Sequence, residues 1–104
     1  MGGKKYKLRI LPLFEEDLNG IVDYITLQLQ NPIAAEHLVD AVEEAIEARL
    51  PFAESFEPYR SARERGYPYY RISVKNYTIF YVVIGDIMEV RRILYSGRDW
   101  GNML

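Results

Sequence analysis

Hydrophobic residues recur every three or four positions in two stretches of the first half of the chain. This spacing predicts two amphipathic helices with core-facing stripes, over residues 13–30 and 33–50. Asn31-Pro32 separates them, because Asn can cap a helix and Pro is accepted in a first turn, and Pro51 ends the second. The stripes are Phe14, Leu18, Ile21, Val22, Ile25 and Leu29, then Ala35, Leu38, Val42, Ala45, Ile46 and Leu50. A tight helical hairpin is expected.

Alternating, β-branched and aromatic segments predict four strands. The first covers residues 6–10, is stopped by Pro12, and is expected at an edge or at the start of a sheet. Residues 51–68 are expected to form a loop or a single helical turn, and three more strands are expected over 70–74, 77–83 and 87–95. Lys75-Asn76 and Gly85-Asp86 have the length of hairpin turns between them. The predicted order is βααβββ.

This order predicts an α+β fold, with an antiparallel sheet and a helical hairpin packed on one face. The other face of the sheet would be left to water, and we expect function there. A chain of 104 residues can bury one core, and no repeat, low-complexity tract or linker divides it. One domain over residues 1–104 is therefore expected.

Charge is distributed unevenly along the chain. Residues 1–58 carry 5 Lys/Arg against 11 Asp/Glu, whereas residues 59–104 carry 8 against 4. A contact with a polyanion or an acidic partner is therefore expected in the second half. No apolar stretch approaches the roughly 20 residues that cross a bilayer, and the N-terminus lacks the layout of a signal peptide. We expect a cytoplasmic protein with no membrane contact.

Several kinds of chemistry lack the residues they need. The chain has no cysteine and a single histidine, and its carboxylates do not follow metal-binding spacings, which argues against a metal site. A serine-hydrolase elbow, a P-loop and a dinucleotide-binding motif are absent from the sequence. We therefore expect no cofactor. His37 lies among acidic residues and is expected to face solvent from the second helix.

The second half of the chain instead combines arginine with tyrosine. Arginine binds phosphate bidentately and aromatic rings stack on bases, so this mixture suits RNA. The same mixture also arises on any sheet with one solvated face, and residue types alone leave both interpretations open.

Strict alternation sorts the residues of the last strand onto two faces. One face would carry Arg91, Ile93 and Tyr95, and the other Val90, Arg92 and Leu94. One of the two arginines must then lie toward the helices or at the sheet rim. An unpaired buried guanidinium is costly, so we expect an ion pair with Glu89, Asp86 or an acidic residue of a helix.

Together with the βααβββ order, four segments resemble the RelE/ParE toxin superfamily over nearly the whole chain. They are Asn31-Pro32-Ile33-Ala34-Ala35 between the helices, Tyr70-Arg71-Ile72, the stretch 77–82, and the ending 92–100. The resemblance implies a bacterial toxin of the plasmid-stabilisation type, encoded beside an antitoxin that wraps it. Some members are endoribonucleases that cleave mRNA in the ribosomal A site. Others poison DNA gyrase and are not enzymes.

Carried over position by position, the resemblance implies a site containing Arg71, Arg98 and Tyr95. Arg71 matches a basic position of the ribonuclease members, and Arg98 matches the arginine after their last strand. Tyr95 or Trp100 would stand in imperfectly for their C-terminal Tyr or His pair, which this chain lacks.

Two other positions depart from the ribonuclease pattern. Thr78 stands where those members usually have arginine, and Ser73 stands where a second basic residue is common. One missing cation can cost on the order of 3 kcal/mol of transition-state stabilisation. Together with the long helical hairpin and a pI of 5.4, this favours a ParE-like action on DNA gyrase. A ribosome-dependent mRNA endoribonuclease is the alternative, and an inactive binding module with the toxin fold is the second.

Overall fold

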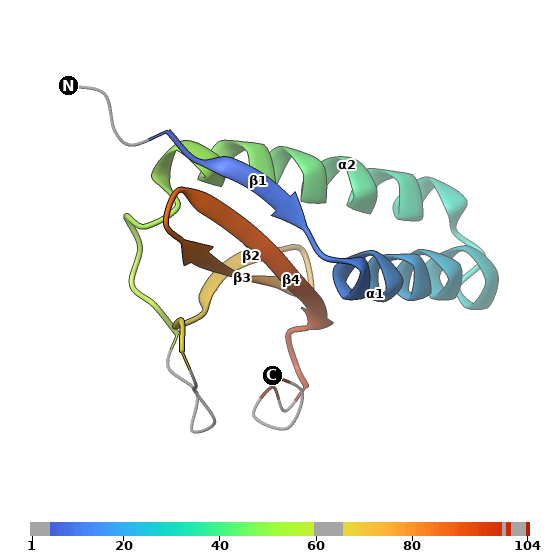
Figure 1. Ribbon diagram of the computed structural model, residues 1–104. Helices are drawn as coiled ribbons and strands as arrows, with labels where there is room; N and C mark the ends of the chain where they lie inside the picture. Colours follow the sequence, from blue (N-terminus) through green and yellow to red (C-terminus); the bar gives the residue numbers. More distant parts are fainter. Residues whose placement is uncertain (1–4, 60–65, 99, 101–103) are drawn as a thin grey trace.

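The computed structural model describes residues 5–59, 66–98, 100 and 104, and confirms the predicted order of elements (Figure 1). The helices and strands are β1 (Lys7–Ile10), α1 (Pro12–Asp23), a π-helical segment (Tyr24–Gln28), α2 (Pro32–Arg49), a short 3₁₀ turn (Leu50–Phe52), β2 (Tyr70–Val74), β3 (Tyr77–Ile84) and β4 (Ile87–Tyr95).

The helical hairpin begins and turns where the sequence predicted. Pro12 and Pro32 occupy the first turns of α1 and α2, and the side chain of Asn31 accepts a hydrogen bond from the Ala34 backbone N–H at 3.1 Å. His37 is exposed on α2, as predicted. Since Asn31 satisfies one of the free N–H groups at the start of α2, the second helix starts directly after the turn.

One residue of the first predicted stripe lies outside the core. The helix does not stay regular to its end, because the Leu29 N–H bonds to the Tyr24 carbonyl five residues back. Such a π turn holds more residues than an α turn and rotates the following side chains around the axis. Leu29 is therefore 56% exposed, whereas Phe14 and Ile25 of the same stripe are buried.

The sheet has the order β1-β4-β3-β2. The last three strands pair antiparallel, as predicted, and β1 lies at an edge. β1 runs parallel to β4, with Lys7 opposite Ile87 and Arg9 opposite Glu89, so the sheet is mixed. Alternation along a strand indicates its faces but not its direction, which is why the sequence did not reveal this pairing.

The helices cover one face of the sheet and form the main core with it. Ile72 and Val74 of β2 face the helices, as expected. The core residues of β3 and β4 are Ile79, Tyr81, Met88, Val90 and Ile93.

The opposite face is not left to water, and this expectation was wrong for its centre. Phe80 and Val82 alternate away from the helices, yet both have no exposed surface. The rings of Tyr59, Tyr69 and Trp100 lie 6.0, 6.1 and 5.0 Å from the ring of Phe80 and cover it. The loop that carries Tyr59 returns to the sheet through a bridge with Tyr69.

A β-bulge breaks the alternation of β4. Tyr81 pairs with Val90 and Phe80 pairs with Arg92, so Arg91 is an extra residue in this strand. As a result, Val90 and Ile93 both face the helices, and the predicted assignment of these two residues to opposite faces was wrong. A bulge places two residues opposite one and shifts the alternation that follows it.

Among the described residues, none of the helices combines the length and hydropathy required of a membrane span. The part of the chain that the structure describes also holds no group of three or more potential metal ligands.

The packing of the hairpin predicts contrasting effects of two leucine substitutions. Leu38 is 1% exposed, so Leu38→Ala should lower the free energy of unfolding by about 2–5 kcal/mol and the melting temperature by about 10 °C or more. Leu29→Ala removes the same atoms from an exposed position and should change the free energy by less than about 0.5 kcal/mol. Thermal and urea unfolding of both variants measure this. Equal losses would contradict the core described above.

Candidate functional site

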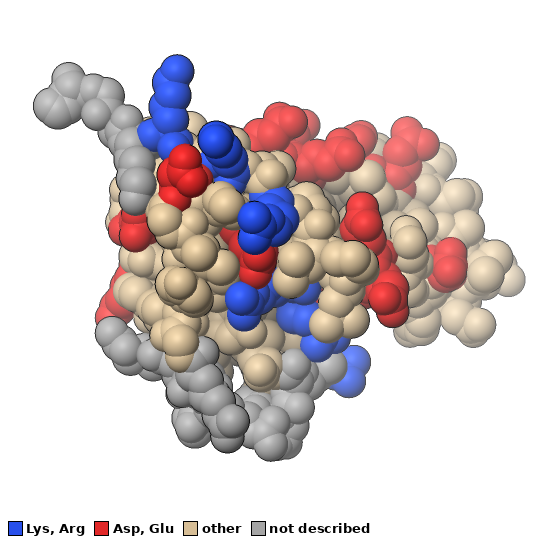
Figure 2. All heavy atoms as spheres, in the orientation of Figure 1, with Lys and Arg blue, Asp and Glu red and all other residues tan. Residues whose placement is uncertain are grey.

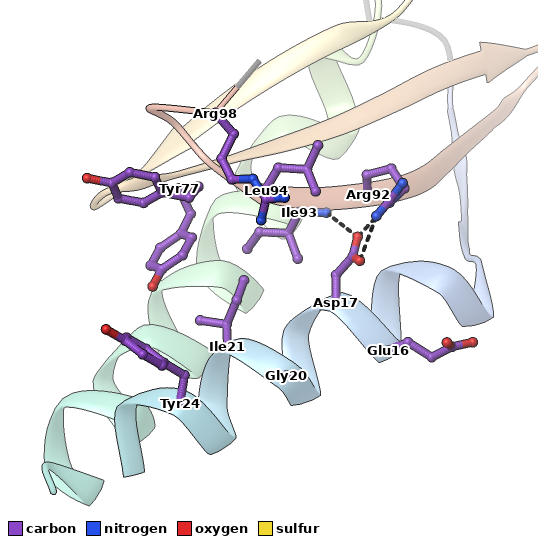
Figure 3. A pocket seen from close by; sticks show the side chains of 11 residues that line it. Glu16, Asp17, Gly20, Ile21, Tyr24, Tyr77, Arg92, Ile93, Leu94 and Arg98 are labelled. Carbon is purple, nitrogen blue, oxygen red and sulfur yellow. Dashed lines mark hydrogen bonds and ion pairs between the residues drawn. The ribbon is translucent and has the colours of Figure 1, made fainter. Parts of the chain in front are cut away.

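An open groove of about 780 Å³ lies between α1 and the ends of β3 and β4 (Figure 3). It is lined by Glu16, Asp17, Gly20, Ile21, Tyr24, Tyr77, Arg92, Ile93, Leu94, Tyr95 and Arg98. Two of the three predicted site residues, Tyr95 and Arg98, belong to this lining.

An ion pair between α1 and the bulged strand forms part of the groove wall. Arg92 donates from Nε and Nη2 to the two oxygens of Asp17, at 2.7 and 2.9 Å (Figure 3). The Ile93 backbone N–H donates to the same carboxylate at 3.1 Å. The hydrogen bond to Asp17 raises the pKa of Arg92. The predicted ion pair with a helix acid is therefore confirmed, and we call these three residues the Asp17 clamp.

Three tyrosines make the aromatic part of the groove. The rings of Tyr77 and Tyr95 meet edge-on, with centroids 6.0 Å apart, and Tyr24 extends from the helix on the other side (Figure 3). Burial raises the pKa of Tyr77, and Tyr24 and Tyr95 raise it further. Tyr24 and Tyr95 are each about half exposed. The groove therefore offers ring surface to a partner.

Arg98 supplies the positive charge of the groove. Its backbone N–H donates to the Tyr95 carbonyl at 3.1 Å, which fixes the turn after β4. A Cβ on Gly97 would lie 2.8 Å from Cε2 of Tyr95, so glycine allows that ring to fold back against the turn. Among the described residues, no carboxylate forms an ion pair with the Arg98 guanidinium.

Arg71, the third predicted site residue, lies elsewhere. It is exposed on the sheet face that points away from the helices, opposite Phe80 on the next strand. Its guanidinium carbon lies 4.9 Å from the centre of the Tyr59 ring, in a hollow of about 460 Å³ that Glu57 and Pro58 complete. The structure thus brings Tyr95 and Arg98 together and separates Arg71 from both.

The two positions that depart from the ribonuclease pattern differ in burial. Ser73 is exposed, whereas Thr78 is 3% exposed and its hydroxyl shares a 2.8 Å hydrogen bond with that of Ser96. An arginine in place of Thr78 would lose this hydrogen bond and its charge would lose water, which is costly. Position 78 is therefore an interior site in this chain.

Comparisons with known proteins identify the family. A family model described as "ParE toxin of type II toxin-antitoxin system, parDE" matches residues 8–100. The chain belongs to this toxin family. A solved structure titled "Chromosomal ParDE TA system from P. aeruginosa" superposes with a TM-score of 0.69 at 19% identity, over 88% of this chain and 96% of the other. At this identity the likeness shows the fold alone. A search of curated proteins found no match.

The sequence did not reveal several lining residues of this ParE-family toxin. Asp17 could not be singled out from the other acidic residues of the helices. Tyr24 had no local signal, and Tyr77 was notable only within the segment 77–82. They line the same groove because α1 packs beside the end of the sheet.

On the other face of the toxin, Glu89 is held between two arginines. Arg9 Nη1 donates to Oε1 at 2.9 Å and Arg91 Nε donates to Oε2 at 2.8 Å, while the glutamate side chain is 8% exposed. Burial raises the pKa of Glu89, but the hydrogen bonds and charges of Arg9 and Arg91 outweigh it and hold the pKa below its ordinary value. The expected pairing of an arginine with Glu89 is confirmed for Arg91.

This depressed pKa predicts how stability depends on pH. A carboxyl with a lower pKa in the folded state stabilises the fold at neutral pH, and this contribution is lost as pH falls below about 4.3 and through the folded value. Glu89→Gln should therefore flatten the loss of stability between about pH 5 and 2. Urea unfolding across this range measures the effect, with the exposed Glu16→Gln as a control. A pH dependence equal to that of wild type would contradict the pairing.

Proposed function

We propose that this protein is a cytoplasmic toxin that arrests growth by acting on DNA gyrase, and that it is not an endoribonuclease. The observation that carries this proposal is the separation of Arg71 from Tyr95 and Arg98. A scissile phosphate needs its cations and its acid or base around one point, within hydrogen-bond reach.

The strand register gives the extent of the separation. Arg71 lies level with Phe80 and Arg92, whereas Tyr95 lies level with Tyr77 and Val74. Arg71 is thus about 10 Å farther along the strands and two strands away, since residues rise about 3.3 Å and strands lie about 4.8 Å apart. It also projects from the opposite face of the sheet. Position 78 is an uncharged, buried threonine, so the further cation that the ribonuclease members carry there is missing.

We place both the activity of the toxin and its inhibition by the antitoxin on the groove. Tyr24 and Tyr95 can receive the apolar side chains of a bound segment, and Arg98 can pair with an acidic residue in it. A segment of the cognate antitoxin in the groove would cover Tyr95 and Arg98, which explains inhibition as direct occlusion of the working surface.

Two assays on the same purified toxin separate the candidate functions. The toxin should trap covalent gyrase–DNA complexes, and it should leave ribosome-bound message uncut in primer extension. Arg98→Gln should lower trapping about 10- to 150-fold, because a lost charge-assisted hydrogen bond is worth about 1.5–3 kcal/mol. Antitoxin should restore gyrase activity, and Tyr95→Ala should weaken its binding.

The opposite results would assign another function. Cleavage of message without trapping would establish the ribosome-dependent endoribonuclease. Binding of antitoxin with neither activity would establish a binding module that has lost its toxicity. If Arg98→Gln and Tyr95→Ala both trap gyrase–DNA complexes as well as wild type does, these two residues do not contribute to the activity.

A further inference from the structure

A band of arginines and aromatic rings crosses the sheet face that points away from the helices. Every strand of the sheet contributes at least one residue to it. Its members are Arg9, Glu89, Arg91, Tyr69, Phe80, Tyr59 and Arg71. We call it the arginine band. It lies outside the groove described above.

The contacts along the band are continuous. Arg9 and Arg91 share Glu89, and the Arg91 guanidinium lies 5.9 Å from the ring of Tyr69. Tyr69 and Tyr59 both pack on Phe80, and Arg71 lies over Tyr59 at 4.9 Å. Because the sheet order is β1-β4-β3-β2, Arg9 and Arg71 stand on opposite edge strands, roughly 14 Å apart at the usual strand spacing.

The band carries excess positive charge at its surface. Glu89 is buried, whereas the Arg9 side chain is half exposed and that of Arg91 is 31% exposed. Glu57 lines the hollow beside Arg71 but forms no ion pair with it, so three arginines face two carboxylates. Arg9 and Arg91 each give Glu89 only one nitrogen, so the carboxylate fixes the two guanidiniums while the other N–H groups of Arg9 stay available to a second acceptor. Figure 2 shows basic side chains over β1 and β4 and acidic ones mainly over the two helices.

We propose that the arginine band binds the phosphate backbone of duplex DNA. Guanidinium groups pair bidentately with phosphate, and contacts of this kind position a protein on DNA without reading its sequence. Their spread across the sheet, rather than around one point, suits a row of phosphates.

The surroundings of the aromatic rings favour duplex over single-stranded nucleic acid. Phe80 is fully buried, and Tyr59 and Tyr69 are partly buried in edge-on or tilted contact with it. Arg71 already lies over Tyr59. These rings support the arginines and offer little free surface for stacking on bases, which single-strand binders require.

An acidic protein partner fits the band less well than DNA. Stable protein interfaces have an apolar centre. The exposed large hydrophobic residues of the described chain lie mainly on the helices, in the groove and after α2, and none is a member of the band.

The biological role of this binding rests on the proposed function. In that setting, the band would hold the DNA segment that gyrase cleaves.

Binding of a labelled duplex of about 30 base pairs and mixed sequence, followed by fluorescence anisotropy at several salt concentrations, tests the proposal. With three phosphate contacts, log Kobs should fall against log salt with a slope of about −2.7. Arg9→Gln/Arg71→Gln should reduce the slope by about 1.8 and weaken binding about a hundredfold at roughly 50 mM salt. Lys75→Asn removes one charge from the β2–β3 turn, where φ is +53° and Asn is accepted, and should bind within about twofold of wild type.

Arg71→Gln alone keeps the test valid if the double variant is unstable, because no described carboxylate forms an ion pair with Arg71. It should reduce the slope by about 0.9. The absence of duplex binding at low salt, or an unchanged slope in both variants, would overturn the proposal. So would tighter binding of a single strand of equal length, or of an acidic peptide. Loss of DNA binding in these variants does not bear on whether wild type traps gyrase, so the two proposals fail separately.

Discussion

The carboxylate of Asp17 joins the helical layer to the sheet beside the bulge of β4, where side chains stop alternating regularly between the two faces. Arg91 is an extra residue in this strand, and such a residue interrupts the regular ladder of backbone hydrogen bonds. Asp17 accepts the N–H of Ile93 and two N–H groups of Arg92, so one helix residue satisfies both the backbone and the charge beside the bulge. This contact and the hydrophobic core together hold α1 against the sheet.

The bulge also decides where the positive charges of the last strand lie. Arg92 reaches Asp17 on α1, while Arg91 pairs with Glu89. Two neighbouring arginines therefore serve two surfaces: a groove with Tyr95 and Arg98, and a band that reaches Arg71. In this account the toxin has a working groove that an antitoxin can cover and a separate basic face toward DNA. Arg71 lies apart from Tyr95 and Arg98.

Much of the fold could be predicted from the sequence, because the helices and strands are set by local spacing. Three features had no signal in this spacing, two because they depend on contacts between distant residues and one because it is a local irregularity of a helix. The parallel pairing of β1 with β4, the π turn that exposes Leu29, and the cover of Tyr59 and Trp100 over Phe80 became visible only in three dimensions. Only part of the candidate site was predicted, because its residues also come from distant parts of the chain. Tyr95 and Arg98 are close in sequence and stay together, but family matching could not show that Arg71 faces away from them.

The most direct test of this account is a double-mutant cycle between Asp17 and Arg92, measured by urea unfolding of Asp17→Asn, Arg92→Gln and the double variant. Asn can still accept the Ile93 N–H, so the cycle isolates the pairing with Arg92. The two side chains are 13% and 19% exposed, which leaves little solvent screening. We predict a coupling free energy of about 1.5–3 kcal/mol. A coupling within about 0.5 kcal/mol of zero would show that the two residues act independently and would contradict the Asp17 clamp.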